Sequence, residues 1–202
     1  MPALLLHACC GPCLLVPAAD LAAQYDRMTV FWYNPNIHPS AEYARREEHL
    51  RAAAARLALP VTAAGGYDAA AWLTGAQAAA GAATAAAGGP RCRYCLHDRL
   101  RAAADAAAAG GYAAFSTTML YSPYLDHAFL VAAGAEEGRR VGVRFHAADW
   151  RARFHEGQRQ AQAWGLYRQN YCGCIYSDNE RQQRRQQRAQ ARAAAALAQG
   201  VN

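Results

Sequence analysis

The chain has 202 residues, which is the length of one ordinary domain with room for a helical tail. Hydrophobic residues make up 53% of it, but 52 residues are Ala, so the bulk of a core must come from larger side chains. All 21 basic residues are Arg, and 15 acidic residues leave a net charge of +6. The absence of Lys excludes a Walker lysine, a Schiff base and a lysine general base.

Cysteine usage and the chain start bear on the compartment. Seven cysteines is an odd number, and the first seven residues contain no basic residue and are followed by no signal-type cleavage site. The Ala-rich run at 76–87 is interrupted by Gly81 and is too weakly apolar to span a bilayer. We therefore expect a soluble, cytoplasmic protein with no membrane partner, in which clustered thiols serve as metal ligands or redox groups.

The predicted elements alternate between strands and helices. Strands are expected at 3–6, 28–33, 59–62, 112–118 and 141–145, and helices at 14–25, 41–57, 68–74, 93–109, 126–140 and 151–164. Ser40 is a predicted N-cap, residues 75–90 are expected to form a loose helix or mobile loop, and the pattern Ser177 to Glu180 predicts a capping box that starts a last helix reaching 198. Such alternation predicts a mostly parallel sheet with helices on both faces and with its sites at the carboxyl ends of the strands.

All seven cysteines lie in three short clusters. Cys9, Cys10 and Cys13 follow the first strand, where open α/β sheets bind ligands. Cys92 and Cys95 form a C-x-x-C at a helix start, which favours thiolates, and Cys172-Gly173-Cys174 forms a C-x-C. Two pairs can make a four-thiolate site for zinc or for an iron–sulfur cluster, and C-x-C suits a redox dithiol.

Three other interpretations of these clusters are weaker. The thiols can be small buried hydrophobes, but clustering disfavours this for seven cysteines. Gly11-Pro12 can belong to a phosphate-binding loop, but it offers one glycine and no Lys. Cys92-x-x-Cys95 can be thioredoxin-like, but it follows a low-complexity segment rather than a first βα unit.

With these motifs in order, the chain resembles the epoxyqueuosine reductases of the cobalamin-independent, iron–sulfur type (QueH). The resemblance covers about residues 4–177. It rests on six segments of the sequence: residues 5–13, residues 33–39 with Glu42-Tyr43, Tyr67-Asp68 with Trp72-Leu73, Arg91-Cys92-x-x-Cys95, residues 116–118 with Ser122-Pro123, and residues 165–174. The chain departs from the family pattern at 76–88, where acidic residues are expected before Gly88-Gly89 and small residues stand instead.

The resemblance implies reduction of epoxyqueuosine to queuosine at the wobble base of tRNA, the last step of queuosine biosynthesis. It also implies a [4Fe–4S] cluster with an adjacent mononuclear iron, and an electron donor that the sequence does not identify. Carried onto this chain, the cluster ligands are Cys9, Cys10, Cys92 and Cys95, and the redox-active pair is Cys172 and Cys174. Cys13 is then a ligand of the second iron or a neighbour of the cluster.

The expected fold is a three-layer α/β sandwich with a mostly parallel, Rossmann-like sheet of the nucleotide alpha-hydrolase-like kind and a C-terminal Arg-rich helix. Residues 1–178 are expected to form one domain that carries every cysteine motif, and residues 179–202 a basic helical tail.

Epoxide deoxygenation also needs proton donors. The candidates are His7 and Tyr171, which lie beside thiols, and His38 with Asp68 from neighbouring strand ends. Each has a structural alternative: a satisfied core histidine, a packed tyrosine, a loop-shaping residue and a helix cap, respectively.

RNA is the large partner that the resemblance implies, and arginine suits phosphate binding and base stacking. The residues expected to contact substrate or the anticodon loop are Arg91, Arg93, Arg168, Asn34 and His38, with an arginine row at 181, 184, 185, 188 and 192. Tyr33, Trp72, Tyr121 and Tyr124 are candidates for stacking on a flipped base. The row is also typical of a solvated helix face, and such aromatic residues are often core.

Two other functions remain open at this stage. A zinc-stapled RNA-binding module predicts one zinc and no colour, and a metal-free thiol–disulfide oxidoreductase predicts a depressed thiol pKa and activity on small disulfides.

Overall fold

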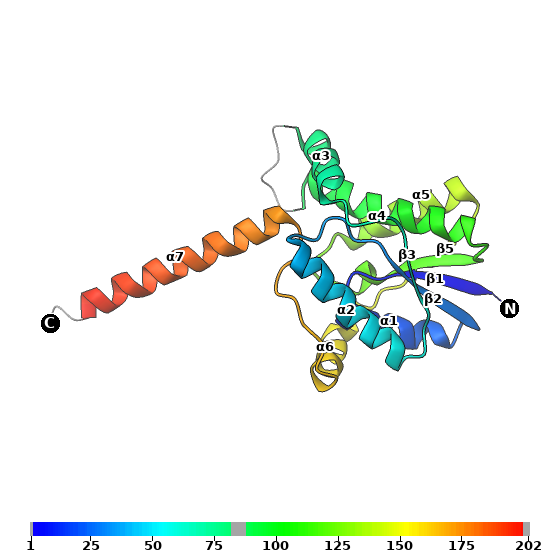
Figure 1. Cartoon of the computed structure of the whole chain (residues 1–202), viewed down its shortest axis with the longest axis horizontal. Helices are drawn as coiled ribbons and strands as arrows, with labels where there is room; N and C mark the ends of the chain where they lie inside the picture. The colour runs from blue at the N-terminus through cyan, green and yellow to red at the C-terminus, as the bar shows by residue number, and fades with distance from the viewer. Residues whose placement is uncertain (1, 82–87, 200–202) are drawn as a thin grey trace.

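The computed structural model describes residues 2–81 and 88–199 and consists of one parallel sheet between two helical layers (Figure 1). The strand order is β3-β2-β1-β4-β5, and every neighbouring pair is parallel. The strands are β1 (Ala3–His7), β2 (Arg27–Trp32), β3 (Val61–Ala63), β4 (Ala114–Thr117) and β5 (Arg144–Phe145).

Helices cover both faces of this sheet, with α1, α2 and α6 on one side and α4 and α5 on the other (Figure 1). The helices are α1 (Gly11–Ala22), α2 (Ser40–Arg56), α3 (Ala69–Ala80), α4 (Pro90–Ala109), α5 (His127–Val141), α6 (Phe154–Ala163) and α7 (Ile175–Gln199), with short 3-10 turns η1 (Thr118–Tyr121) and η2 (Arg151–Arg153). No helix in the described part of the chain has the length and apolar character needed to cross a membrane.

The apolar run of β1 is buried on both faces of the sheet. Leu4 and Leu6 pack in one core with α1 and α2, whereas Leu5 packs in the other with Ala103 and Ala107 of α4. Alternation of side chains along a strand explains this division, and two covered faces explain why the strand is apolar at every position. The predicted three-layer α/β architecture is therefore confirmed.

Several predicted boundaries differ from the structure. The predicted strand at 112–118 shortens to β4, which is followed directly by η1. The predicted strand at 141–145 shortens to β5, because α5 ends at Val141 with Gly142 in the left-handed region at φ 72°. Helix α3 continues to Ala80, six residues beyond its predicted end and into the segment expected to be loose. Residues 82–87 of that segment lie outside the described residues.

The predicted capping box at 177–180 is wrong, because α7 already begins at Ile175. The Ser177 hydroxyl instead donates to the carbonyl oxygen of Cys174 at 2.9 Å. The proposed division between residues 178 and 179 falls inside α7, which leaves the body of the molecule as one long helix (Figure 1).

Candidate active site

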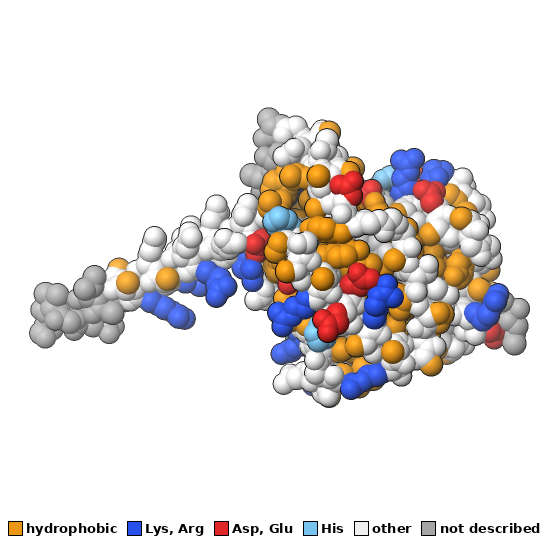
Figure 2. Space-filling view, viewed as in Figure 1, with side chains coloured by type: hydrophobic (Ala, Val, Ile, Leu, Met, Phe, Trp, Pro, Cys, Tyr) orange, Lys and Arg blue, Asp and Glu red, His pale blue; other side chains and the backbone are white. Residues whose placement is uncertain are grey.

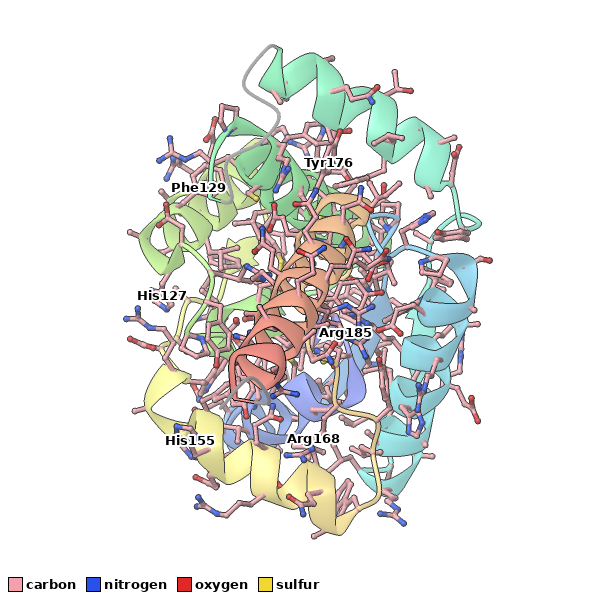
Figure 3. All side chains as sticks on the ribbon, turned by 90° about the vertical axis from the view of Figure 1, so that its left-hand side faces the viewer. His127, Phe129, His155, Arg168, Tyr176 and Arg185 are labelled. Atoms are coloured by element: carbon pink, nitrogen blue, oxygen red, sulfur yellow. The ribbon has the colours of Figure 1, made fainter. Side chains whose placement is uncertain are left out.

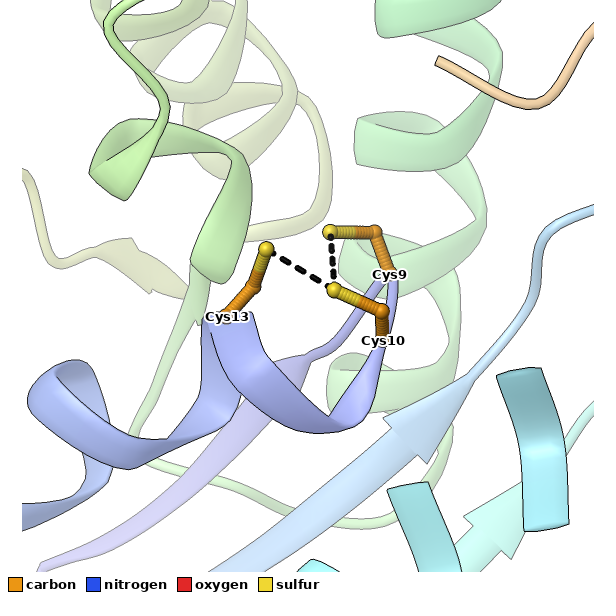
Figure 4. Close-up of side chains that lie close together, drawn as sticks. All are labelled: Cys9, Cys10 and Cys13. Carbon is orange, nitrogen blue, oxygen red and sulfur yellow. Dashed lines mark hydrogen bonds between the residues drawn. The ribbon is translucent and has the colours of Figure 1, made fainter. Parts of the chain in front are cut away.

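The first cysteine cluster lies where β1 ends and α1 begins (Figure 4). The Sγ atoms of Cys10 and Cys13 are 2.9 Å apart, and those of Cys9 and Cys10 are 3.9 Å apart. Cys10 and Cys13 are buried and Cys9 is half-buried. In the described part of the chain this is the single group of three Cys, His, Asp or Glu side chains with ligand atoms within 4.8 Å of one another, and it can hold a metal ion.

Hydrogen-bond donors surround the sulfur atoms of this trio. The Thr118 hydroxyl lies 3.5 Å from the Cys9 sulfur, and the Gln169 amide donates to the Cys10 sulfur at 2.9 Å. Hydrogen bonds with Cys10 and Cys13 hold the pKa of the Cys9 thiol well below its usual value. Burial raises the pKa of Cys10. The hydrogen bond between Cys13 and Cys10 raises the pKa of Cys13. Among the three thiols, Cys9 is therefore the one whose thiolate form is favoured.

The third cluster is a close dithiol with unequal members. The Sγ atoms of Cys172 and Cys174 are 3.6 Å apart, and Ser177 Oγ lies 2.9 Å from the Cys172 sulfur. The hydrogen bond from Cys174 lowers the pKa of Cys172 to about 5 and raises that of Cys174. Cys172 is exposed and Cys174 is buried. At neutral pH one thiol is therefore a thiolate and the other keeps its proton.

The loop that carries this dithiol is fixed by Arg46 of α2. Its guanidinium donates to the carbonyl oxygens of Cys172 at 3.0 Å and Tyr171 at 3.2 Å, and to Glu42 at 2.7 Å. Gly173 has φ 118°, and a Cβ there would lie 2.9 Å from the Arg46 guanidinium. The middle residue of the C-x-C is thus a glycine for both conformational and steric reasons.

The second cluster lies in the first turns of α4. The backbone N–H of Gly88 donates to the Cys92 sulfur at 3.3 Å. Cys95 is buried in a small cluster with Trp72 and Cys174, and burial raises the pKa of Cys95 to about 11. The structure therefore brings Cys95 beside the third cluster, and it does not bring Cys92 and Cys95 within the 4.8 Å spacing of the trio.

A cavity of about 520 Å³ joins the first and third clusters at the carboxyl edge of the sheet. Cys9, Cys13 and Cys172 line it together with Arg46 and Arg99. Its size lies in the range of small-molecule sites. This edge, seen in Figure 3, is where sites of parallel α/β sheets are expected.

Arg99 is a site residue that the sequence analysis missed. It is only 6% exposed, it lines the cavity, and its Nε donates to the carbonyl oxygen of Cys95 at 3.1 Å. No carboxylate within the described ranges lies within 4.0 Å of its guanidinium. Its charge helps to lower the pKa values of Cys9 and Cys172. The spacing of four residues after Cys95 on one helix is the signal that was available.

His7 and Asp68 have structural contacts that agree with their alternative interpretations. The His7 ring lies 2.8 Å from the Thr117 hydroxyl and 3.0 Å from the carbonyl oxygen of Tyr33. Burial lowers the pKa of His7 to about 4, so the ring is neutral at pH 7. Asp68 caps α3 by accepting a hydrogen bond from Ala71 at 2.9 Å.

Tyr171 and His38 shape the loop around the dithiol. The Tyr171 hydroxyl donates a hydrogen bond to the carbonyl oxygen of His38 at 2.7 Å. The backbone N–H of His38 donates to the carbonyl oxygen of Gly173, also at 2.7 Å. Burial raises the pKa of Tyr171 to about 12. Tyr171 nevertheless lines the cavity, between the guanidinium groups of Arg46 and Arg181.

The predicted RNA-contacting residues separate into buried and exposed ones. Arg91 is buried and pairs with Glu180 at 2.7 Å, which fastens α7 to α4. Asn34 is buried and donates to the carbonyl oxygen of Ala8 at 2.9 Å. Arg93 and Arg168 are exposed, the latter at the lower end of the edge shown in Figure 3.

The aromatic candidates for base stacking also differ in access. Tyr121 and Trp72 are buried, and Tyr33 is half-buried. Tyr124 is 82% exposed and lines the cavity. Among the four candidates, Tyr124 is the most exposed.

Comparison with known proteins gives a consistent family. The family model of epoxyqueuosine reductase QueH matches residues 4–180. A protein named epoxyqueuosine reductase QueH from Dehalococcoides mccartyi is 35% identical over 180 residues, covering 89% of this chain and 94% of the relative. The protein of that name from Thermotoga maritima is 33% identical over 190 residues, covering 91% and 94%.

Among solved structures, one titled as a predicted subunit of tRNA methyltransferase from Methanocaldococcus jannaschii aligns with 79% of this chain and 76% of its own, at TM-score 0.49 and 12% identity, a likeness that carries no functional information. The family match over most of the chain favours an oxidoreductase over a zinc-stapled module or a metal-free thiol oxidoreductase. This chain belongs to the QueH family of epoxyqueuosine reductases.

Proposed function

We propose that this chain reduces the epoxide of epoxyqueuosine to the alkene of queuosine at the wobble base of tRNA, in the cavity lined by Cys9, Cys13 and Cys172. The observation that carries the proposal is that one cavity joins thiols of the first and third clusters. A site that combines a metal-binding trio with a redox dithiol has the parts that epoxide deoxygenation requires.

The dithiol can supply the two electrons that the reaction consumes. Conversion of an epoxide to an alkene and water consumes two electrons and two protons. Formation of a disulfide from the Cys172 thiolate and the Cys174 thiol releases two electrons and one proton. The second proton comes from solvent, while both C–O bonds of the epoxide break and the oxygen leaves as water. A reductant from outside the chain must then restore the dithiol.

The unequal thiols suit this role. The thiolate of Cys172 is the reactive member, and Cys174 holds a proton that the departing oxygen needs. Their sulfur atoms are 3.6 Å apart, against about 2.0 Å in a disulfide. Disulfide formation requires the two sulfur atoms to close this gap.

The first cluster fits a metal centre by its chemistry. Thiolates are the ligands of iron–sulfur clusters, and Arg99 and Gln169 provide a positive charge and an amide donor beside the sulfur atoms. The ligands that we propose for a [4Fe–4S] cluster are Cys9, Cys10, Cys92 and Cys95, with Cys13 as candidate ligand of an adjacent mononuclear iron. When bound, these groups supply single electrons at low potential and a Lewis acid for the epoxide oxygen.

A second set of ligands for the metal centre is supported by a separate observation. Cys13 lies 2.9 Å from Cys10, whereas Cys92 and Cys95 lie outside the compact group. A centre held by Cys9, Cys10 and Cys13 is therefore the competing assignment.

The proposed partner is a tRNA whose anticodon loop enters the cavity with the wobble base turned outward. Tyr124, which lines the cavity, is the residue that we expect to stack on that base, and Arg168 is exposed on the same edge. The proposed location is the cytoplasm, where tRNA is modified.

The test begins with iron and acid-labile sulfide per chain after strictly anaerobic purification, followed by the visible spectrum before and after dithionite. We expect about four sulfides per chain, about four irons from the cluster with one more where the mononuclear iron is bound, and an absorption that bleaches. The same sample should convert tRNA-bound epoxyqueuosine to queuosine, measured on digested nucleosides by mass spectrometry. Colourless protein with one zinc and no conversion would overturn the proposal in favour of an RNA-binding module.

A further inference from the structure

The family match ends at residue 180, but α7 continues through Gln199. Figure 1 shows this helix projecting from the carboxyl edge of the sheet. Residues 182–195 are all exposed, and the segment 181–199 holds five arginines and no acidic residue. Beyond Tyr176, no residue of α7 belongs to a hydrophobic cluster of the described chain, so this part of the helix leaves the body of the domain without a packed apolar face.

The five arginines occupy one face of α7. With about 100° of rotation per residue, Arg181, Arg184, Arg185, Arg188 and Arg192 fall within an arc of roughly 100°. They extend over about 16 Å along the helix axis. Figure 2 shows the blue side chains along one side of the projecting helix, while its opposite side in that view is uncharged.

The first arginine fixes the direction of this face. Arg181 donates to the Oδ1 of Asn170 at 3.1 Å, and its guanidinium lies 4.5 Å from the centre of the Tyr171 ring. Asn170 and Tyr171 both line the cavity. The other four arginines share the face of Arg181, so the row starts at the rim of the cavity and leads away from it.

The positive charge of the arginine row indicates an anionic binding partner. Within the described residues no ion pair involves Arg184, Arg185, Arg188 or Arg192, so four guanidinium groups remain for an external anion. A second copy of α7 would bring the same positive face and be repelled. A chain of phosphates, spaced along a backbone and continuous with a base in the cavity, matches a row of arginines with about one per turn.

We propose that the arginine row of α7 is an arm that binds the phosphate backbone of the tRNA substrate next to the nucleotide held in the cavity. This inference rests on the proposed function. It adds a binding surface outside the region that the family model covers.

The test is a triple variant, Arg185→Gln, Arg188→Gln and Arg192→Gln, in the full-length anaerobic protein. Glutamine keeps helix propensity and removes three charges far from the thiols. The matched control is Arg27→Gln, Arg101→Gln and Arg139→Gln, which removes three exposed arginines from other elements. Circular dichroism should show equal helix content in both variants.

Binding is measured by fluorescence anisotropy with labelled tRNA over a range of salt, which requires no turnover. We expect the slope of log K against log salt to fall in magnitude by about 2 to 3 for the arm variant and by less than one for the control. We expect KM for tRNA to rise at least tenfold with kcat unchanged.

The outcomes separate the two proposals. Equal salt slopes and equal KM in both variants, with normal turnover, would overturn the arm and leave the proposed function intact. Loss of tRNA affinity in the arm variant, with no turnover even in the unaltered protein, would support the arm and contradict the proposed function. A dimer that the arm variant dissociates without loss of tRNA affinity would overturn the arm in favour of self-association.

Discussion

The guanidinium of Arg46 donates to the carbonyl oxygen of Cys172 at 3.0 Å, so a residue of α2 holds the backbone that carries the Cys172 thiol. The same side chain is 2% exposed and pairs with Glu42 one helical turn earlier at 2.7 Å. This buried pair connects a helix of the sandwich to the loop that carries the dithiol.

Replacement of Arg46 should therefore reduce both stability and activity. Arg46→Gln leaves Glu42 without its partner and two loop carbonyls without their donor, so we expect a loss of about 3 kcal/mol in the free energy of unfolding. Arg51→Gln is the matched control, because Arg51 pairs with Glu47 at the same spacing on the same helix but is exposed. It should cost no more than about 0.5 kcal/mol in urea unfolding. Equal losses would contradict the anchoring role.

The glycine of the C-x-C gives a second prediction. Gly173→Ala places a Cβ against the Arg46 guanidinium in a left-handed conformation, which should cost about 1 to 3 kcal/mol and abolish turnover. Gly66→Ala is the control, since its Cβ would meet no atom within 4 Å and its φ is not in the left-handed range. Urea unfolding and the nucleoside assay measure both effects. Full activity in Gly173→Ala would show that the loop does not need this conformation.

Arg99 leads to a prediction about pH. The pKa of Cys172 is lowered to about 5, partly by Arg99, so the thiolate fraction should rise through pH 5 and be nearly complete by about pH 6. Removal of the cation in Arg99→Met should move that rise to higher pH, because the thiolate loses a stabilising charge. Arg99→Lys should restore part of it.

The measurement is the rate of Cys172 alkylation by iodoacetamide against pH, followed by peptide mass spectrometry. Arg101→Met, an exposed arginine on the same helix, is the control and should leave the profile unchanged. An unchanged profile in Arg99→Met would mean that Cys174 and Ser177 alone set the pKa of Cys172.

The alternation of strands and helices could be predicted from the sequence, whereas two of the buried side chains at the site could not. Apolar runs and prolines locate β1 and β2 because burial on both faces leaves few choices of residue. The position of the first cluster just after β1 and of the second at a helix start follows from the same pattern, and the structure agrees with both. Arg46 and Arg99 were missed because the sequence does not distinguish a buried arginine from an exposed one. Only the tertiary structure shows which guanidinium groups lie next to thiols and carbonyl oxygens. The start of α7 was missed because Ser177 bonds to sulfur and a carbonyl rather than capping a helix.

The last prediction concerns which thiols hold the metal. If Cys92 is a ligand and Cys13 is a neighbour, Cys92→Ala should lose most of the iron and sulfide, while Cys13→Ser keeps the cluster. If the compact trio is the ligand set, the result is reversed, because Cys13 lies 2.9 Å from Cys10. Cys174→Ala is the control for general damage at the site: it should keep iron and colour and lose turnover, because it removes half of the dithiol. Iron, sulfide and the visible spectrum, measured on all three variants purified side by side without oxygen, decide between the two sets. A Cys174→Ala protein that turns over normally would remove the dithiol from the mechanism, since no second thiol would remain beside Cys172 to complete the disulfide.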